Sequence, residues 1–161
     1  MIGLISDSHD NLEALRQIVE IFNHLECSLV IHAGDFVAPF AARELSRLRC
    51  PLQAVFGNCD GEKEGLKKAI NGWGHIQPAP SEFKAAGLRF HLRHIPLPEE
   101  KLISLQGKVD VYLFGHTHKP LIEKREELLI INPGEAGGWL TGQCSYALLE
   151  PTTKEVTLHY L

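Results

Sequence analysis

Three short apolar runs in the first part of the chain each stop abruptly at polar residues, and this repeated pattern constrains the fold more than any other feature. The runs cover residues 1–6, 28–33 and 51–56, each about the length of one buried strand. A segment with helical character follows each run. Strands that alternate with helices pair in parallel through crossover connections, so we expect an α/β fold in which these strands end along one edge of a sheet. In open α/β sheets, ligands bind at that edge.

The segments between these runs have the spacing of amphipathic helices. After the first run, apolar residues recur three or four positions apart, at Leu12, Leu15, Ile18, Val19, Phe22 and Leu25. Asp10 or Asn11 is a suitable N-cap for this helix. Pro39 fits the first turn of a second helix, at about 40–48, and a third is expected at about 62–70.

The second half of the chain has a different pattern. The turn at 72–74 and two prolines, Pro78 and Pro80, end the alternation. Beyond them we expect strands at 82–85 and 88–92, a helix at 98–106, a strand at 109–114, two strands within 121–131, and an antiparallel pair at 145–150 and 155–160. No linker or repeat divides the chain, so residues 1–161 are expected to form a single domain.

Composition excludes several classes of partner. The net charge of −4 and the sequence pI of about 6.1 provide no basic field, which argues against long nucleic acid. No apolar run approaches the roughly 20 residues of a membrane helix, so no membrane partner is expected. The four cysteines fit no metal-binding spacing, and an acid at position 7 argues against a signal peptide. We therefore expect a cytoplasmic protein, and the oligomeric state is left open.

Seven residues at the expected strand ends have side chains that bind metals: Asp7, His9, Asp35, Asn58, His94, His116 and His118. Nitrogen and oxygen donors without a thiolate suit Mn, Fe, Ni or Zn. So many donors exceed the needs of one tetrahedral ion and suit two adjacent ions that share a carboxylate. Such pairs, roughly 3.5–4 Å apart, clamp phosphoryl groups and generate a hydroxide nucleophile. A bend at Gly115 is expected to let both histidines that follow it converge on the site.

Each of these residues also has an ordinary structural explanation when it is taken alone. His9 is a typical helix-start residue, Asp35 a typical N-cap and Asn58 a typical left-handed turn residue. His94 alone fits a strand histidine. Such separate roles do not require a complete set of two-metal ligands to occur together, so we prefer the metal interpretation. Other histidines keep ordinary structural roles: His24, His32, His75, His91 and His159.

In these blocks the sequence resembles the calcineurin-like metallophosphoesterases, and in particular their small single-domain branch of YfcE type. The resemblance covers nearly the whole chain and rests on Asp7-Ser8-His9, Gly34-Asp35, Gly57-Asn58-Cys59-Asp60, His94, Gly115-His116-Thr117-His118 and Asn132-Pro133-Gly134. It implies a four-layer αββα sandwich, in which two mixed β-sheets face each other and helices cover them on the outside.

The resemblance also implies how the ligands divide between two divalent ions, with manganese as the expected metal. One ion would be held by Asp7, His9, Asp35 and His118. The other would be held by Asp35, Asn58, His94 and His116, so that Asp35 bridges the two. A hydroxide between the ions would attack the phosphorus of a small phosphate ester in line. Catalytic roles are expected for Asp35, Asn58 and His94. Cys59 is a further candidate, either as a weak acid or as part of the pocket wall.

Three departures from the family pattern bear on the substrate. Cys59 replaces a histidine that is thought to protonate the leaving oxygen in many relatives, and a neutral thiol with a pKa of about 8.5 is a poorer acid, so good leaving groups are favoured. Ile95 replaces glycine and is expected to add bulk beside the second ion. Glu135 replaces serine, a nearby arginine is absent, and we expect Glu135 to repel dianionic monoesters.

These features predict a metal-dependent phosphodiesterase. A phosphomonoesterase with the same centre is the nearest alternative. A non-catalytic protein-binding scaffold, like the retromer subunit of this fold, is a second alternative, although the ligands are eroded in that relative and intact here. Nuclease action on long nucleic acid is a weaker option, because the chain lacks added domains and a basic groove.

Overall fold

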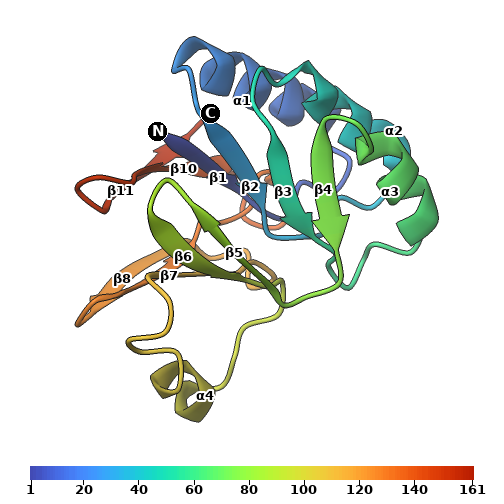
Figure 1. The fold of residues 1–161 in the computed structure, drawn as a ribbon. Helices are drawn as coiled ribbons and strands as arrows, with labels where there is room; N and C mark the ends of the chain where they lie inside the picture. Colours follow the sequence, from blue (N-terminus) through green and yellow to red (C-terminus); the bar gives the residue numbers. More distant parts are fainter.

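A computed structural model describes residues 1–161 as two β-sheets that pack face to face, with helices on both outer sides (Figure 1). The first sheet has six strands in the order β11-β10-β1-β2-β3-β4. Their bounds are β1 Ile2–Ile5, β2 Leu29–His32, β3 Leu52–Val55, β4 Gly74–Gln77, β10 Ser145–Glu150 and β11 Glu155–Tyr160. Strands β1 to β4 pair in parallel, which confirms the predicted crossovers, and β10 runs antiparallel to β1 and β11.

The helices of this half follow the predicted alternation with one difference. They are α1 Leu12–His24, α2 Pro39–Ala42, the 3₁₀-helix η1 Arg43–Arg47 and α3 Lys63–Ile70. Asn11 caps α1, because its Oδ1 accepts a hydrogen bond from Ala14 N at 3.1 Å. The single helix predicted at 40–48 is instead a short α-helix that continues as η1. No side chain caps the N-terminus of α2. Short connecting segments such as η1, which has five residues, often adopt the tighter 3₁₀ form.

One strand of the first sheet was not predicted from the sequence. The turn at 72–74 was expected to end the alternation, but Gly74–Gln77 forms β4, a fourth parallel strand at the sheet edge. Only Ile76 of this strand is buried, so the apolar run that identifies a central strand is missing. Strand β4 is therefore held in the sheet mainly by its backbone pairing with β3, and less by the burial of its side chains.

The second sheet has five strands in the order β5-β6-β7-β9-β8. Their bounds are β5 Ser81–Ala85, β6 Leu88–Leu92, β7 Val111–Leu113, β8 Leu121–Arg125 and β9 Leu128–Asn132, with α4 Glu99–Ile103 between β6 and β7. The strands predicted at 82–85 and 88–92 and the two within 121–131 form antiparallel pairs. Strands β6, β7 and β9 are parallel to one another, so this sheet is mixed, as expected.

Three apolar clusters separate the layers. Leu15, Phe22 and Leu66 belong to the cluster between the helices and the first sheet. Leu4, Ile31 and Val111 belong to the cluster between the two sheets, and Leu102 and Tyr112 to the cluster under α4. This order of layers confirms the αββα sandwich. The longest helix, α1, has 13 residues, and no helix is long and apolar enough to cross a membrane.

The loops that follow β1 and β7 lie close together at one end of the two sheets. Gly115, just after β7, lies so near the β1 loop that a Cβ atom at this position would be 1.9 Å from Ser6 Oγ and 2.6 Å from Asp7 Oδ2. Both Ser6 and Asp7 are buried. Glycine is therefore required at position 115 for space.

We expect Gly115→Ala to lower the free energy of unfolding by about 1–3 kcal/mol, because the new methyl group overpacks the junction. Gly61→Ala is the matched control, since a Cβ at position 61 meets nothing within 4 Å. The control should change stability by no more than about 0.5 kcal/mol. Equilibrium urea unfolding measures both. Equal midpoints for the two variants would contradict the close approach.

Candidate metal centre

Every predicted ligand follows the carboxyl end of a strand. Asp7 and His9 follow β1, Asp35 follows β2 and Asn58 follows β3, all in the first sheet. The remaining ligands come from the second sheet, where His94 follows β6 and β7 is followed by His116 and His118. The structure brings all of them together at one end of the sandwich, in two neighbouring groups.

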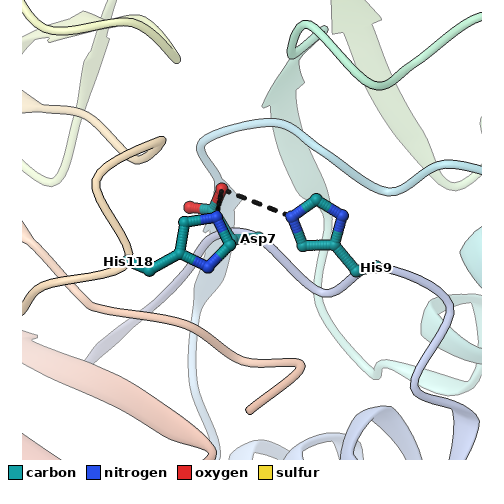
Figure 2. Close-up of side chains that lie close together, drawn as sticks. All are labelled: Asp7, His9 and His118. Carbon is teal, nitrogen blue, oxygen red and sulfur yellow. Dashed lines mark ion pairs between the residues drawn. The ribbon is translucent and has the colours of Figure 1, made fainter. Parts of the chain in front are cut away.

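The first group contains Asp7, His9 and His118 (Figure 2). Asp7 Oδ1 lies 3.7 Å from His9 Nε2 and 3.4 Å from His118 Nε2. The two imidazoles are stacked, with ring centroids 5.2 Å apart. One ligand atom from each residue lies within 4.8 Å of the others, so a single cation can contact all three.

The second group contains Asp35, Asn58, His94 and His116. His94 Nε2 lies 3.3 Å from Asp35 Oδ2 and 3.0 Å from Asn58 Oδ1. On the other side of the ring, His94 Nδ1 is 2.8 Å from the Ala33 carbonyl oxygen, so Nδ1 carries the proton that is donated there. Nε2 is then free to bind a cation. The His116 ring meets the His94 ring edge-on, at 5.2 Å between centroids.

The carboxylate of Asp35 lies between the two groups. Its Oδ2 atom is 3.6 Å from His9 Nε2 and 3.3 Å from His94 Nε2. Its Oδ1 atom accepts a hydrogen bond from Cys59 N at 2.7 Å. Asp7 is held in the same way, because its Oδ2 accepts from His116 N at 3.0 Å while its Oδ1 has no hydrogen-bond partner. Each carboxylate thus has one oxygen fixed by backbone and one directed at the histidines.

The backbone at these ligands is strained. Five of them have a left-handed φ: Asp7 at 53°, His9 at 41°, Asp35 at 61°, His116 at 68° and His118 at 59°. A residue other than glycine in such a region costs about 1–3 kcal/mol, and such residues cluster at functional sites. The bend predicted at Gly115 therefore occurs at His116 and His118 themselves, and Gly115 provides clearance.

Buried polar atoms without partners indicate what the centre binds. Asp7 Oδ1 and His9 Nε2 are buried and have no hydrogen-bond partner. An unsatisfied buried polar atom costs about 1–3 kcal/mol, so such atoms in a native structure require an explanation. A divalent cation among these nitrogen and oxygen donors satisfies both. The residues present therefore fit a metal site.

The charge state of the cluster is consistent with cation binding. Burial alone would raise the pKa of Asp35, but the His94 imidazole and the Cys59 N–H outweigh it and lower the pKa below its ordinary value. Burial also raises the pKa of Asp7, whereas its contacts with His9 and Ser6 lower it. The contacts outweigh burial, so the pKa of Asp7 is lowered overall. Both carboxylates are ionised at neutral pH.

Comparison with known proteins identifies the family. Residues 1–154 match the calcineurin-like phosphoesterase superfamily domain. The chain belongs to this superfamily. It is therefore a hydrolase that acts on phosphoric ester bonds. The resemblance inferred from the sequence blocks is confirmed.

Relatives of the chain in this superfamily extend over almost its whole length. The phosphodiesterase MJ0936 of Methanocaldococcus jannaschii is 39% identical over 160 residues, which is 96% of this chain and 95% of that protein. Phosphodiesterase YfcE of Escherichia coli is 27% identical over 90% of this chain and 84% of its own length. The solved structure of an archaeal phosphodiesterase has a TM-score of 0.89 and 34% identity, and covers 99% of both chains.

The superfamily motifs include residues that hold the ligand loops and not the ligands themselves. Asp60 is buried, and its carboxylate accepts hydrogen bonds from Asp35 N at 3.1 Å, Gly57 N at 2.7 Å and Val37 N at 2.8 Å. It therefore fastens the loop after β2 to the loop after β3. Asp10 has a smaller role of the same kind, because it accepts only from Ala38 N, at 2.9 Å.

The shared Asn132 block supports the two histidines after β7. Asn132 is buried, and its Nδ2 donates to the Gly115 carbonyl oxygen at 3.1 Å and to Thr117 Oγ1 at 2.9 Å. His32 is a buried strand histidine, as predicted. Burial lowers its pKa to about 3, so it is neutral and links Ser8 Oγ, at 3.0 Å, to the Gly34 N–H, at 3.1 Å.

Glu135 makes more contacts inside the protein than the sequence indicated. Its expected repulsion of dianionic substrates stays a prediction, and the side chain is buried with its Oε1 3.1 Å from His118 Nδ1. Its oxygens also accept from Leu140 N at 3.0 Å, Thr141 N at 3.0 Å and Thr141 Oγ1 at 2.9 Å. The charge is therefore engaged inside the protein. Sequence reasoning missed this neighbour of His118, and its only signal was an acid directly after the Asn132 block.

A cavity of about 320 Å³ opens over the ligands. It is lined by His9, Asp35, Asn58, Cys59, His116, His118, Glu135, Trp139 and Leu140. No lysine or arginine is among them. Ile95 is not among the lining residues and is 48% exposed, and its effect on the second ion stays a prediction. Burial, with the neighbouring Asp35, raises the pKa of Cys59 to about 11, which keeps its thiol neutral.

Asp60→Ala should lower the free energy of unfolding by about 3 kcal/mol or more, because three backbone N–H groups lose a charged acceptor. Asp10→Ala is the matched control and should cost only about 1 kcal/mol, since a single N–H is affected. Urea unfolding in the presence of a chelator separates this effect from metal binding. A loss for Asp60→Ala no larger than that of the control would contradict the fastening role.

Proposed function

We propose that the chain is a phosphodiesterase that uses two divalent metal ions. The observation that carries this proposal is the position of the Asp35 carboxylate between two complete sets of donors. One ion would be held by Asp7, His9, Asp35 and His118. The other would be held by Asp35, Asn58, His94 and His116. Manganese is the ion we expect, and the donor set also suits Ni, Fe or Zn.

When bound, the ions would act as Lewis acids on the phosphoryl oxygens and lower the pKa of a water molecule enough for it to attack phosphorus at neutral pH. Hydrogen bonds within the protein already orient the ligand atoms toward this site. The fixed oxygens of Asp7 and Asp35 leave their partner oxygens facing the donors. The Ala33 carbonyl selects the tautomer of His94, and Glu135 lies against Nδ1 of His118, so that its Nε2 faces Asp7.

The cavity favours a diester over a monoester. A phosphodiester carries a single negative charge, whereas a monoester carries close to two near neutral pH. No lysine or arginine lines the cavity to balance the second charge. This argument does not depend on Glu135, whose carboxylate oxygens accept hydrogen bonds from Leu140 and Thr141. The neutral Cys59 thiol is a weak proton donor, which supports ester groups that leave readily without one.

The single-domain organisation and the cytoplasmic location stay predictions. A phosphomonoesterase with the same centre and a non-catalytic scaffold are the alternatives, and the experiments below distinguish them from the proposal.

Purified protein with added Mn²⁺ should hydrolyse bis(p-nitrophenyl) phosphate faster than p-nitrophenyl phosphate. Asp35→Ala should abolish both reactions and remove both ions, because its carboxylate belongs to both sets. Absorbance of released p-nitrophenolate measures turnover, and elemental analysis measures bound metal. A metal-loaded protein that turns over neither ester would refute the enzymatic proposal, and a preference for the monoester would reverse the choice of substrate.

A separate experiment tests the assignment of His116 and His118 to different ions. Because His118 lies beside Asp7, the double variant Asp7→Ala/His118→Ala should lose one ion and keep the other. His116 belongs to the other set, so Asp7→Ala/His116→Ala should lose both. Metal content after dialysis against a weak chelator measures the difference. If the His116 pair retained an ion and the His118 pair did not, the assignment would be reversed.

A further inference from the structure

Two apolar side chains at the mouth of the cavity are not used by the proposed metal centre. Trp139 is 65% exposed and Leu140 is 77% exposed, in the loop between β9 and β10. Both line the same cavity as His9, Asn58 and His116. An isolated exposed apolar residue is ordinary on a protein surface, but here two adjacent ones border a site for a polar substrate.

The loop that carries them is held firmly against the ligands. Trp139 Nε1 donates to the carbonyl oxygen of His9 at 2.9 Å, so the edge of the indole is fixed while the ring is largely exposed. The main chain that precedes it is also anchored, because Gly137 N donates to the Asp7 carbonyl oxygen at 2.9 Å. Buried Glu135 holds Leu140 N from the other side, at 3.0 Å. An aromatic ring that is already positioned loses little conformational entropy when a ligand covers it.

The chemistry of the cavity restricts what can lie against this ring. The exposed lining residues outside the proposed ligand set are Trp139, Leu140 and Cys59, and no lysine or arginine lines the cavity. A charged or strongly hydrated group would lose its solvation there without gaining a partner. A flat, uncharged ring would gain both burial and stacking.

We propose that Trp139 is the platform on which an uncharged aromatic ring of the substrate stacks, while the phosphate lies at the metal centre. The preferred substrates are then phosphodiesters with an aryl or nucleobase-bearing substituent, and not simple alkyl diesters. The proposal rests on the proposed function for the position of the phosphate. It adds the part of the molecule that selects the substrate.

Equilibrium binding tests the platform without relying on turnover. The protein is loaded with Zn²⁺, and methyl phosphate, phenyl phosphate and thymidine 5′-monophosphate are titrated by calorimetry. The two ligands with rings should bind about tenfold more tightly than methyl phosphate, because only they can stack on the indole. Tighter binding of the thymidine ligand than of phenyl phosphate would identify nucleotides as the source of the ring, and equal binding would identify aryl groups in general.

The chain provides its own reporter, because Trp73 and Trp139 are its only tryptophans. Trp73 donates to the Ala69 carbonyl oxygen and lines a different cavity, so Trp73→Phe leaves the rim intact and isolates the signal of Trp139. In that variant the ligands with rings should quench the fluorescence, and methyl phosphate should not. Trp139→Phe should retain the preference for rings, whereas Trp139→Ala should remove it.

Two results would overturn the platform. One is equal affinity of the unmodified protein for all three ligands. The other is a Trp139→Ala variant that weakens all three equally, because that would assign Trp139 only a structural contact with His9. Hydrolysis of methyl p-nitrophenyl phosphate with Mn²⁺ is measured in parallel. Absence of turnover together with a retained ring preference would refute the phosphodiesterase proposal and leave the platform standing.

Discussion

The hydrogen bond from His116 N to Asp7 Oδ2 joins the two sheets at the point where the ligands gather. It connects the loop after β1 to the loop after β7, and it can form only because Gly115 has no side chain. The matching bond from Cys59 N fixes Asp35 within the first sheet. With these two contacts the protein can bury two carboxylates and still leave one oxygen of each available. Burial of two unpaired carboxylates would otherwise cost several kcal/mol for each ion.

The same contacts explain why the strained backbone persists. Residues other than glycine keep a left-handed φ only where hydrogen bonds from the surrounding structure fix their conformation. Asp60 supplies three such bonds to the loops after β2 and β3, and Asn132 supplies two to the loop after β7. In an extended strand, His116 and His118 would point to the same face. The left-handed turns instead direct one ring toward His94 and the other toward Asp7. Backbone strain thus separates the two halves of the centre.

Much of the fold follows from patterns that a single sequence displays. The apolar runs of β1, β2 and β3 are buried, and each ends where a ligand was expected, because a central parallel strand must be apolar throughout. Strand β4 was missed because an edge strand with only Ile76 buried has no such run. The inward orientation of Glu135 was missed because it depends on contacts with His118 and Thr141, which lie 17 and 6 positions away. Loop residues of this kind are placed by tertiary contacts and not by local periodicity.

Glu135 links the two parts of the proposed site. One side of its carboxylate faces His118, and the other holds the loop that presents Trp139 and Leu140 at the rim. A side chain as short as serine could not make both contacts, so the length of Glu135 couples the position of His118 to the order of the rim. If the phosphate lies at the proposed metal centre, the rim that Glu135 orders is the part of the site that meets the group attached to the phosphate.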